Sequence, residues 1–226
     1  MIGEFIRGCS YIDSGVYVKC LCKGTDDLRN VSLTFDDGPD EVMTPKILDI
    51  LKEHNIKATF FLIGKKAKKF PELVTRIIDE GHIIGGHTWK HTYFFPFKST
   101  KKVYKEFCKC EDILHKITGK TVALFRPPFG ITNPNIAKAI EEKRYIPIGW
   151  SVRSFDTVET SDRKDVLERI STNLHNGAII LMHDRCKKSD ELLNMVITDI
   201  KGKQYNIVPL DEMLDIEPYN ENYNKR

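Results

Sequence analysis

The chain has 226 residues, with 35 lysines and arginines against 32 aspartates and glutamates, for a formal net charge of +3. With 41% hydrophobic and 30% charged residues, its composition excludes a disordered, collagen-like or coiled-coil chain and leaves room for one domain with a sizeable core. No run of about 18 apolar residues is present and the net charge is small, so the sequence predicts neither an integral membrane segment nor a nucleic-acid partner.

The N-terminal segment, residues 1–29, is predicted to be an extension that packs on the main fold. Its first residues lack a secretory signal, because Glu4 and Arg7 interrupt the apolar residues there. We therefore expect a cytoplasmic protein. A location outside the cytoplasm stays open if the natural chain begins upstream of Met1.

The six cysteines are too few for a disulfide-dense scaffold, and without a signal they are predicted to be reduced thiols. Alternation over residues 16–23 predicts a strand with Cys20 and Cys22 on one face, whereas a three-four apolar stripe predicts a helix with Cys108 and Cys110 on opposite sides. We interpret these residues as small buried hydrophobes; a disulfide or metal clip would need a partner that the sequence does not identify. The cysteines are Cys9, Cys20, Cys22, Cys108, Cys110 and Cys186.

From residue 30 onward, short apolar runs alternate with amphipathic segments, which is the pattern of β/α units. No linker rich in Pro, Gly or Ser divides the chain, so we predict a single α/β domain over residues 30–216 and a polar tail over residues 217–226. The predicted strands are Val31 to Phe35, Ala58 to Ile63, Ile83 to Gly86, Ala123 to Arg126, Ile146 to Ser151, Ala178 to His183 and Asn206 to Pro209. The predicted helix starts are Thr44-Pro45, Asn133-Pro134, Ser161-Asp162 and Ser189-Asp190.

Three pairs of lysines stand in the helical segments: Lys65-Lys66, Lys68-Lys69 and Lys101-Lys102. We interpret them as solvated helix faces. A local patch for an anionic polymer is the alternative.

Polar residues stand at or just after the ends of several apolar strands. Five contributing segments are more than the crevice of an open doubly wound sheet needs, and they are typical of a barrel whose strand ends share one rim. We therefore predict an irregular, TIM-like (β/α) barrel of about seven strands. The residues on this rim are Asp36, Asp37, His87, Arg126, Asp156 and His183.

Asp36 and Asp37 leave a strand side by side and meet the turn residues Gly38 and Pro39. Adjacent carboxylates repel each other unless a cation lies between them or one is protonated, so a metal ligand beside a general base is one interpretation. An acidic turn without a function is the other.

His87 and His91 are four residues apart, a spacing that places both imidazoles on one face of a helical turn. They follow Gly85 and Gly86, which let the backbone turn closely. With one carboxylate they make a set of three ligands that leaves room for water, the pattern of a catalytic site for zinc or a similar divalent ion. The other histidines are interpreted as structural: His54, His82, His115 and His175.

Two further strand ends carry candidate residues. Arg126 opens a turn stiffened by two prolines, which fixes backbone N–H groups, so the Phe129 amide is a candidate oxyanion donor and Arg126 a candidate partner for a carboxylate. A strand exit with a packed Phe is the alternative. His183 follows the most hydrophobic strand of the chain, where a lone imidazole is more often a structural residue.

Taken together and in this order, these segments resemble the polysaccharide deacetylases, the NodB-homology group also called carbohydrate esterase family 4, over roughly residues 30–214. The resemblance implies a metal-dependent hydrolase that removes N-acetyl, or O-acetyl, groups from a glycan such as N-acetylglucosamine oligomers or peptidoglycan. It implies one divalent ion, zinc first, with cobalt, nickel and manganese as alternatives. The implied roles are Asp36 as base, His183 as acid, Arg126 and Asp156 as their supporting residues, Asp37, His87 and His91 as metal ligands, Phe129 as oxyanion donor, and Pro128, Leu181 and Trp150 as substrate-binding residues.

The fourth motif of the family is where this chain departs from the pattern. The family commonly has an Asp-rich stretch ending in Asp-Trp. Here Asp156 is retained, Arg153 stands at the earlier Asp position and Thr157 at the Trp position, so we expect an altered groove wall and an altered substrate choice. A hydrolase of a linear amide or cyclic imide on the same scaffold, and a non-catalytic glycan-binding module, are the alternative functions.

Overall fold

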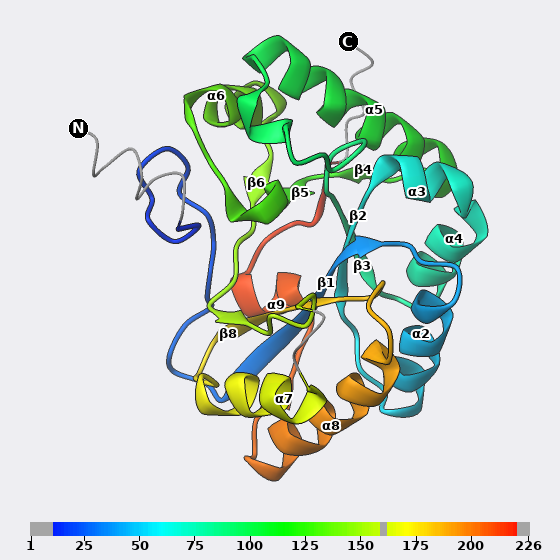
Figure 1. Ribbon diagram of the computed structural model, residues 1–226, viewed down its shortest axis with the longest axis vertical. Coiled ribbons are helices and arrows are strands. Elements are labelled where there is room, and N and C mark those ends of the chain that lie inside the picture. Colours follow the sequence, from blue (N-terminus) through cyan, green and yellow to red (C-terminus); the bar gives the residue numbers. More distant parts are fainter. Residues whose placement is uncertain (1–10, 159–161, 221–226) are drawn as a thin grey trace.

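The computed structural model describes residues 11–158 and 162–220. Its centre is a parallel sheet in the order β6-β5-β3-β2-β1-β8-β7, and β9 pairs with the first residues of β1. Helices surround this sheet on its outer side (Figure 1). The strands are β1 (Asn30–Gly38), β2 (Thr59–Leu62), β3 (Ile83–Gly86), β5 (Leu124–Phe125), β6 (Ile146–Pro147), β7 (Val152–Arg153), β8 (Ala178–His183) and β9 (Asn206–Ile207).

The helices follow the strands in the order expected of β/α units. No helix in the described part of the chain has the length and apolar character needed to cross a membrane. A separate antiparallel pair joins β4 (Thr121–Val122) to β10 (Tyr219–Asn220), so part of the segment predicted as a polar tail is paired in a sheet. The main helices are α2 (Met43–Glu53), α3 (Gly64–Lys69), α4 (Pro71–Asp79), α5 (Thr100–Thr118), α6 (Pro134–Lys143), α7 (Arg163–Thr172), α8 (Ser189–Gly202) and α9 (Leu210–Leu214).

The predicted barrel of about seven strands is confirmed, in the form of a curled half-barrel. Its two edge strands, β6 and β7, do not pair with each other, and the segment between them crosses the gap. Ile148 N–H donates to the carbonyl of Phe125 on one side, and Ser151 N–H donates to the carbonyl of Ile179 on the other. The single predicted strand Ile146 to Ser151 is therefore wrong as a unit, because the chain leaves one edge and joins the opposite one.

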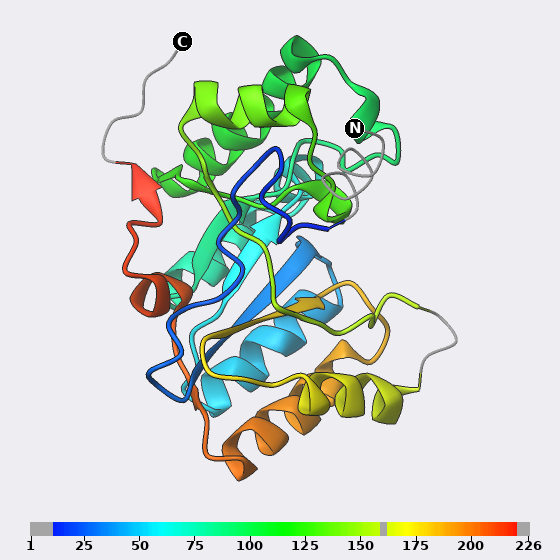
Figure 2. The ribbon, with the colours of Figure 1, turned by 90° about the vertical axis from the view of Figure 1, so that its left-hand side faces the viewer.

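Residues 11–29 of the N-terminal extension lie along this open side of the sheet (Figure 2). The strand predicted over residues 16–23 is wrong: only isolated bridges form, from Leu21 to Ile148 and from Lys23 to Ala178. The physical reason is that the neighbouring edge strands are two residues long and offer no continuous row of backbone partners. Burial raises the pKa of the Cys20 thiol to about 12, which agrees with an unreactive thiol. Cys9 lies outside the described residues.

Two of the predicted helix caps are confirmed, and two are wrong, since Ser189 is the first residue of α8 and no side chain caps that helix. The Asn133 side chain accepts from Ile136 N–H at the start of α6, and Asp162 accepts from Lys164 N–H at the start of α7. Thr44 does not cap α2, which begins one residue earlier. Its hydroxyl donates instead to the buried carboxylate of Asp184, 2.5 Å away.

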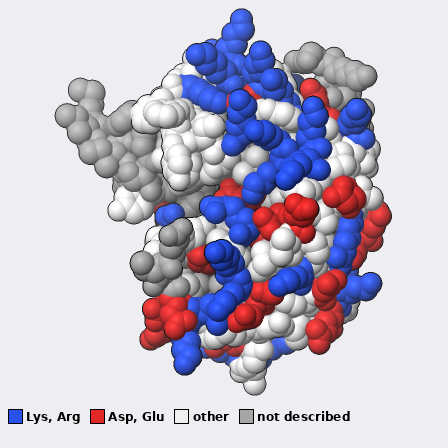
Figure 3. Space-filling view, turned by 45° about the vertical axis from the view of Figure 1, so that its right-hand side comes forward, with Lys and Arg blue, Asp and Glu red and all other residues white. Residues whose placement is uncertain are grey.

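Lysine and arginine side chains gather over the upper part of the face shown in Figure 3. On α3, Lys65, Lys68 and Lys69 are exposed, as predicted for a solvated helix face. Lys66 differs, because it is half-buried and its Nζ donates to the backbone carbonyl of Asp37 at 2.7 Å. Lys66 therefore points toward Asp37, one of the candidate site residues.

The inner face of the half-barrel is buried and carries apolar side chains together with the hydroxyl groups of Ser32 and Thr34. Phe61 is fully buried there together with Leu124 and Ile179, whereas its neighbour Phe60 faces the helices, as the two-residue period of a strand requires. Gly85 lies directly beside the Phe61 ring: a Cβ built at Gly85 would be 2.6 Å from that ring and 3.1 Å from the Leu124 carbonyl.

Replacing Gly85 with Ala is therefore expected to destabilise the fold by about 1–3 kcal/mol, the usual cost of overpacking a core. The measurement is the free energy of unfolding in urea. Gly202→Ala is the matched control, because a Cβ at that helix position meets nothing within 4 Å. Equal stability of the two variants would contradict the close approach of Phe61 to Gly85.

Candidate active site

The predicted site residues meet at the carboxyl ends of the parallel strands. Asp36 lies near the carboxyl end of β1 and is paired in register with His183 at the end of β8, so the two residues lie opposite each other on adjacent strands. His87 directly follows β3, and Arg126 directly follows β5. The rim predicted from the strand ends is thus present in the structure.

Asp36 and Asp37 both face the site although they are neighbours in a strand. Successive strand residues normally point to opposite faces. Here Asp37 adopts a left-handed conformation, with φ of 73°, and the pairing register shifts between Asp36 and Gly38. This irregularity turns the second carboxylate toward the same side as the first, and both are buried.

The two histidines lie in a loop and not on the helical turn that their spacing predicted. Thr88 and His91 both have positive φ, and the Thr88 hydroxyl accepts a hydrogen bond from His91 N–H, which closes the turn. The imidazole rings still converge, with centroids 4.6 Å apart. The close packing of Gly85 against Phe61 explains the glycine before the turn, whereas Gly86 has more space.

Asp37, His87 and His91 form a three-ligand set. Asp37 Oδ1 lies 3.6 Å from His87 Nε2 and 3.5 Å from His91 Nε2, and these ligand atoms all lie within 4.8 Å of one another. His87 Nδ1 is 2.8 Å from the carbonyl of Arg126. Since a carbonyl only accepts, Nδ1 carries the proton and Nε2 presents its lone pair to the site.

The electrostatics of this set fit a bound cation. Asp37 Oδ1 is buried and has no hydrogen-bond partner, a costly arrangement for a carboxylate unless a cation satisfies it. Burial acts to raise the pKa of Asp37, but His87 and His91 outweigh it and hold that pKa well below its usual range. Burial lowers the pKa of His91 to about 4, which keeps its imidazole neutral and able to ligate.

Arg126 supports Asp36 from below. It is fully buried, and its Nη1 donates to Asp36 Oδ1 and to the Thr34 hydroxyl, each at 2.8 Å. The remaining donors reach the carbonyls of Ile148 and Gly149, and its guanidinium lies 4.2 Å from the centre of the Phe61 ring. A carboxylate held in this way is fixed in orientation.

His183 is supported from the other side by Asp156. His183 Nδ1 lies 2.7 Å from Asp156 Oδ1, and the His183 backbone N–H donates to Asp156 Oδ2 at 2.7 Å. Ser154 adds a third bond by donating to Asp156 Oδ1 at 2.8 Å. Burial acts to lower the pKa of His183, but the hydrogen bond and charge of Asp156 raise it above its ordinary value.

The predicted substrate-binding residues surround these groups at different depths. Phe129 lies in a turn with φ of 61°, and its half-exposed ring packs on His91, with centroids 4.6 Å apart. Pro128 and Leu181 are buried. Trp150 packs its ring against Gly130, where a Cβ would be 2.6 Å away. Their proximity to the site is observed, and their roles toward a substrate stay predictions.

Two residues beside Asp37 escaped the sequence analysis. Arg185 Nε donates to Asp37 Oδ2 at 2.7 Å, so the second oxygen of the carboxylate is held while the first faces the histidines. Lys66 holds the Asp37 carbonyl. The only sequence signal for Arg185 is that it lies two residues after His183. Lys66 stands in a run of lysines that resembles an exposed helix face. Neither residue type nor spacing therefore identifies these two residues.

Comparisons with known proteins agree on one family. The family model for polysaccharide deacetylases matches residues 23–147. The chain is 37% identical over 215 residues to the peptidoglycan-N-acetylglucosamine deacetylase of Bacillus cereus, covering 93% of this chain and 74% of the relative. It is 33% identical over 194 residues to the peptidoglycan-N-acetylmuramic acid deacetylase PdaA of Bacillus subtilis, covering 84% and 73%. The crystal structure of the Bc1960 peptidoglycan N-acetylglucosamine deacetylase superposes with a TM-score of 0.81 at 35% identity, covering 88% of this chain and 94% of that one.

Proposed function

Because the chain belongs to the polysaccharide deacetylase family and is a hydrolase of amino-sugar amide bonds, we propose that it removes N-acetyl groups from a peptidoglycan-type glycan with Asp36 as base and His183 as acid. The interpretation of the chain as a non-catalytic glycan-binding module is thereby set aside. The observation that carries the proposal is the placement of a candidate base, Asp36, and a candidate acid, His183, beside the same set of three metal ligands. Asp36 is fixed by an arginine, and His183 is fixed by an aspartate.

Asp37, His87 and His91 would hold a divalent cation, for which we propose zinc. When bound, the ion supplies Lewis acidity toward the acetamide carbonyl and toward the attacking water. The buried, unpartnered Asp37 Oδ1 and the neutral His91 support this assignment.

The residues of the chain divide the remaining work. Asp36, oriented by its hydrogen bond from Arg126, accepts a proton from the attacking water as the C–O bond forms. The Phe129 backbone N–H takes the part of donor to the oxygen that gains negative charge. His183, kept protonated by Asp156, gives its proton to the amine nitrogen as the C–N bond breaks. Acetate and a free amino sugar result.

Acetate release from chelator-stripped protein reloaded with single divalent ions tests this function. The substrates are N-acetylglucosamine oligomers of graded length and peptidoglycan. Release that depends on the ion and is lost in His183→Ala supports the proposal. No release from any glycan by protein that binds the ion stoichiometrically contradicts it and favours a hydrolase of linear amides or cyclic imides. Acetate released only from O-acetylated glycans assigns an esterase.

Replacing Asp156 with Asn is expected to move the alkaline limb of the kcat/KM profile to lower pH. Asp156 raises the pKa of His183, so His183 stays protonated to higher pH in the native protein than it would alone. Removing the charge lowers that pKa, and the general acid is lost earlier as the pH rises. The acidic limb, which reports the base, is expected to move less. A profile that falls uniformly at all pH values would contradict the acid role of His183.

A further inference from the structure

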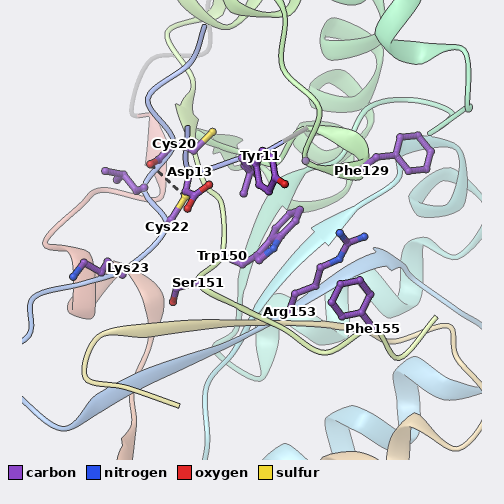
Figure 4. A pocket seen from close by; sticks show the side chains of 13 residues that line it. Tyr11, Asp13, Cys20, Cys22, Lys23, Phe129, Trp150, Ser151, Arg153 and Phe155 are labelled. Carbon is purple, nitrogen blue, oxygen red and sulfur yellow. Dashed lines mark hydrogen bonds between the residues drawn. The ribbon is translucent and has the colours of Figure 1, made fainter. Parts of the chain in front are cut away.

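A cavity of about 630 Å³ opens beside the candidate active site. The N-terminal extension contributes one wall through Tyr11. The other wall is formed by Trp150 of the crossing segment, Arg153 of β7 and Phe155 directly after it (Figure 4). The Phe129 ring, which packs on the candidate metal ligand His91, closes the side toward the active site. The cavity therefore borders the site where the acetamide would react, with Phe129 between the two.

The walls of this cavity combine aromatic side chains with a single fixed guanidinium. Arg153 lies 4.4 Å from the centre of the Phe155 ring and 5.8 Å from that of Trp150. Phe155 has a φ of 56°, and the loop is anchored by Arg169, which donates to the Ser154 carbonyl at 2.6 Å. Cation–π packing thus holds the Arg153 head in the cavity with its N–H groups available.

The charges in the cavity leave Arg153 uncompensated. Among residues 11–158 and 162–220 no carboxylate lies within ion-pair distance of it. Asp13, the acidic residue of the lining, lies at the opposite end beside Cys20 and Cys22 (Figure 4). Lys23 is exposed and already paired with Asp26 at 3.0 Å. The end of the cavity nearest Phe129 and Phe155 is therefore cationic.

We propose that this cavity binds the sugar next to the acetamido unit being hydrolysed and that Arg153 recognises a carboxylate on that sugar. The inference rests on the proposed deacetylase function and adds the residue that selects the substrate. Flat aromatic faces suit a sugar ring, and a guanidinium is matched to a carboxylate by its two parallel N–H donors. The carboxylate could belong to a lactyl ether, as in muramic acid, or to a uronic acid.

The test uses three tetrasaccharides, of which the first two differ only in this carboxylate. One alternates N-acetylglucosamine with N-acetylmuramic acid that carries a free lactyl carboxylate, and the second is the same glycan with that group converted to its methylamide. A third alternates N-acetylglucosamine with glucuronic acid. We expect kcat/KM for the free lactyl form to exceed that of the methylamide by about 10–100-fold, the value of a charge-assisted hydrogen bond. A stronger preference for the third glycan would assign the uronic acid instead.

In Arg153→Gln this ratio is expected to fall to about 1, because the amide side chain is uncharged. Arg163→Gln is the matched control: Arg163 is paired with Glu191 at 2.9 Å and does not line the cavity, so the ratio is expected to stay as in the native protein. The proposal would be overturned if the ratio were unchanged in Arg153→Gln. It would also be overturned if the native protein showed the same kcat/KM for both acidic glycans as for the methylamide.

Calorimetric binding of the same glycans to chelator-stripped protein separates this proposal from the proposed function. If the native protein releases no acetate but binds the carboxylate form more tightly than the methylamide, and Arg153→Gln removes the difference, the cavity is assigned and the deacetylase function fails. If acetate is released but neither rate nor binding depends on the carboxylate, the function stands and the role of Arg153 fails.

Discussion

Replacing Asp36 with Asn is expected to lower kcat by about 10²–10⁴-fold, the usual contribution of a general base. Asn has the same shape and keeps an oxygen that can accept from Arg126 Nη1, so the hydrogen bond at 2.8 Å has a partner in the variant. What the variant loses is the ability to take a proton. The fall is therefore expected in kcat and kcat/KM together, with little change in KM.

The same variant is expected to keep its cation. Asp36 Oδ2 lies 3.8 Å from His87 Nε2, but the ligand set consists of Asp37, His87 and His91. Stoichiometric binding of zinc by Asp36→Asn, measured by calorimetry, separates loss of the base from loss of the ion. Full activity in this variant would show that another group accepts the proton, whereas loss of the ion would place Asp36 in the ligand set.

The long buried strands of this fold could be predicted because their sequences are short, uninterrupted apolar runs, which are typical of strands inside a parallel sheet. Residues 178–183 are apolar until His183, and the predicted bounds agree with β8. β1 extends beyond its predicted end because Asp36 and Asp37 are polar yet buried, which a hydrophobic pattern does not reveal. β7 escaped prediction because two residues, Val152 and Arg153, carry no periodicity.

The site residues could be named from the sequence, but their geometry could not. Parallel strands bring their carboxyl ends together, so polar residues that follow apolar runs mark the rim. The left-handed Asp37 and the loop that carries His91 depend on contacts with distant segments, and their residue types do not demand positive φ. Arg185 can be recognised as a site residue only from its hydrogen bond to Asp37. The two residues are far apart in the sequence and come together only in the folded chain.

Replacing Arg126 with Met is expected to destabilise the protein by about 3–5 kcal/mol, the cost of leaving one member of a buried ion pair without its partner. Asp36, about 3% exposed, would lose the hydrogen bond and the charge of its partner, and the carbonyls of Ile148 and Gly149 would each lose a hydrogen bond. Because these two carbonyls belong to the segment that crosses the open side of the half-barrel, the loss is expected to loosen that closure as well.

The double variant Arg126→Met with Asp36→Asn separates the two causes. If the unpaired charge dominates, removing it recovers part of the loss, so that the double variant is less destabilised than the sum of the single variants by about 1–3 kcal/mol. If the crossing segment dominates, the effects add, since the amide introduced by Asp36→Asn does nothing for those carbonyls. Urea denaturation of all four proteins measures the coupling. Additive effects would show that Arg126 stabilises the half-barrel mainly through the crossing segment. A large coupling would show that its pairing with Asp36 is the reason that a charged side chain is buried beneath the site.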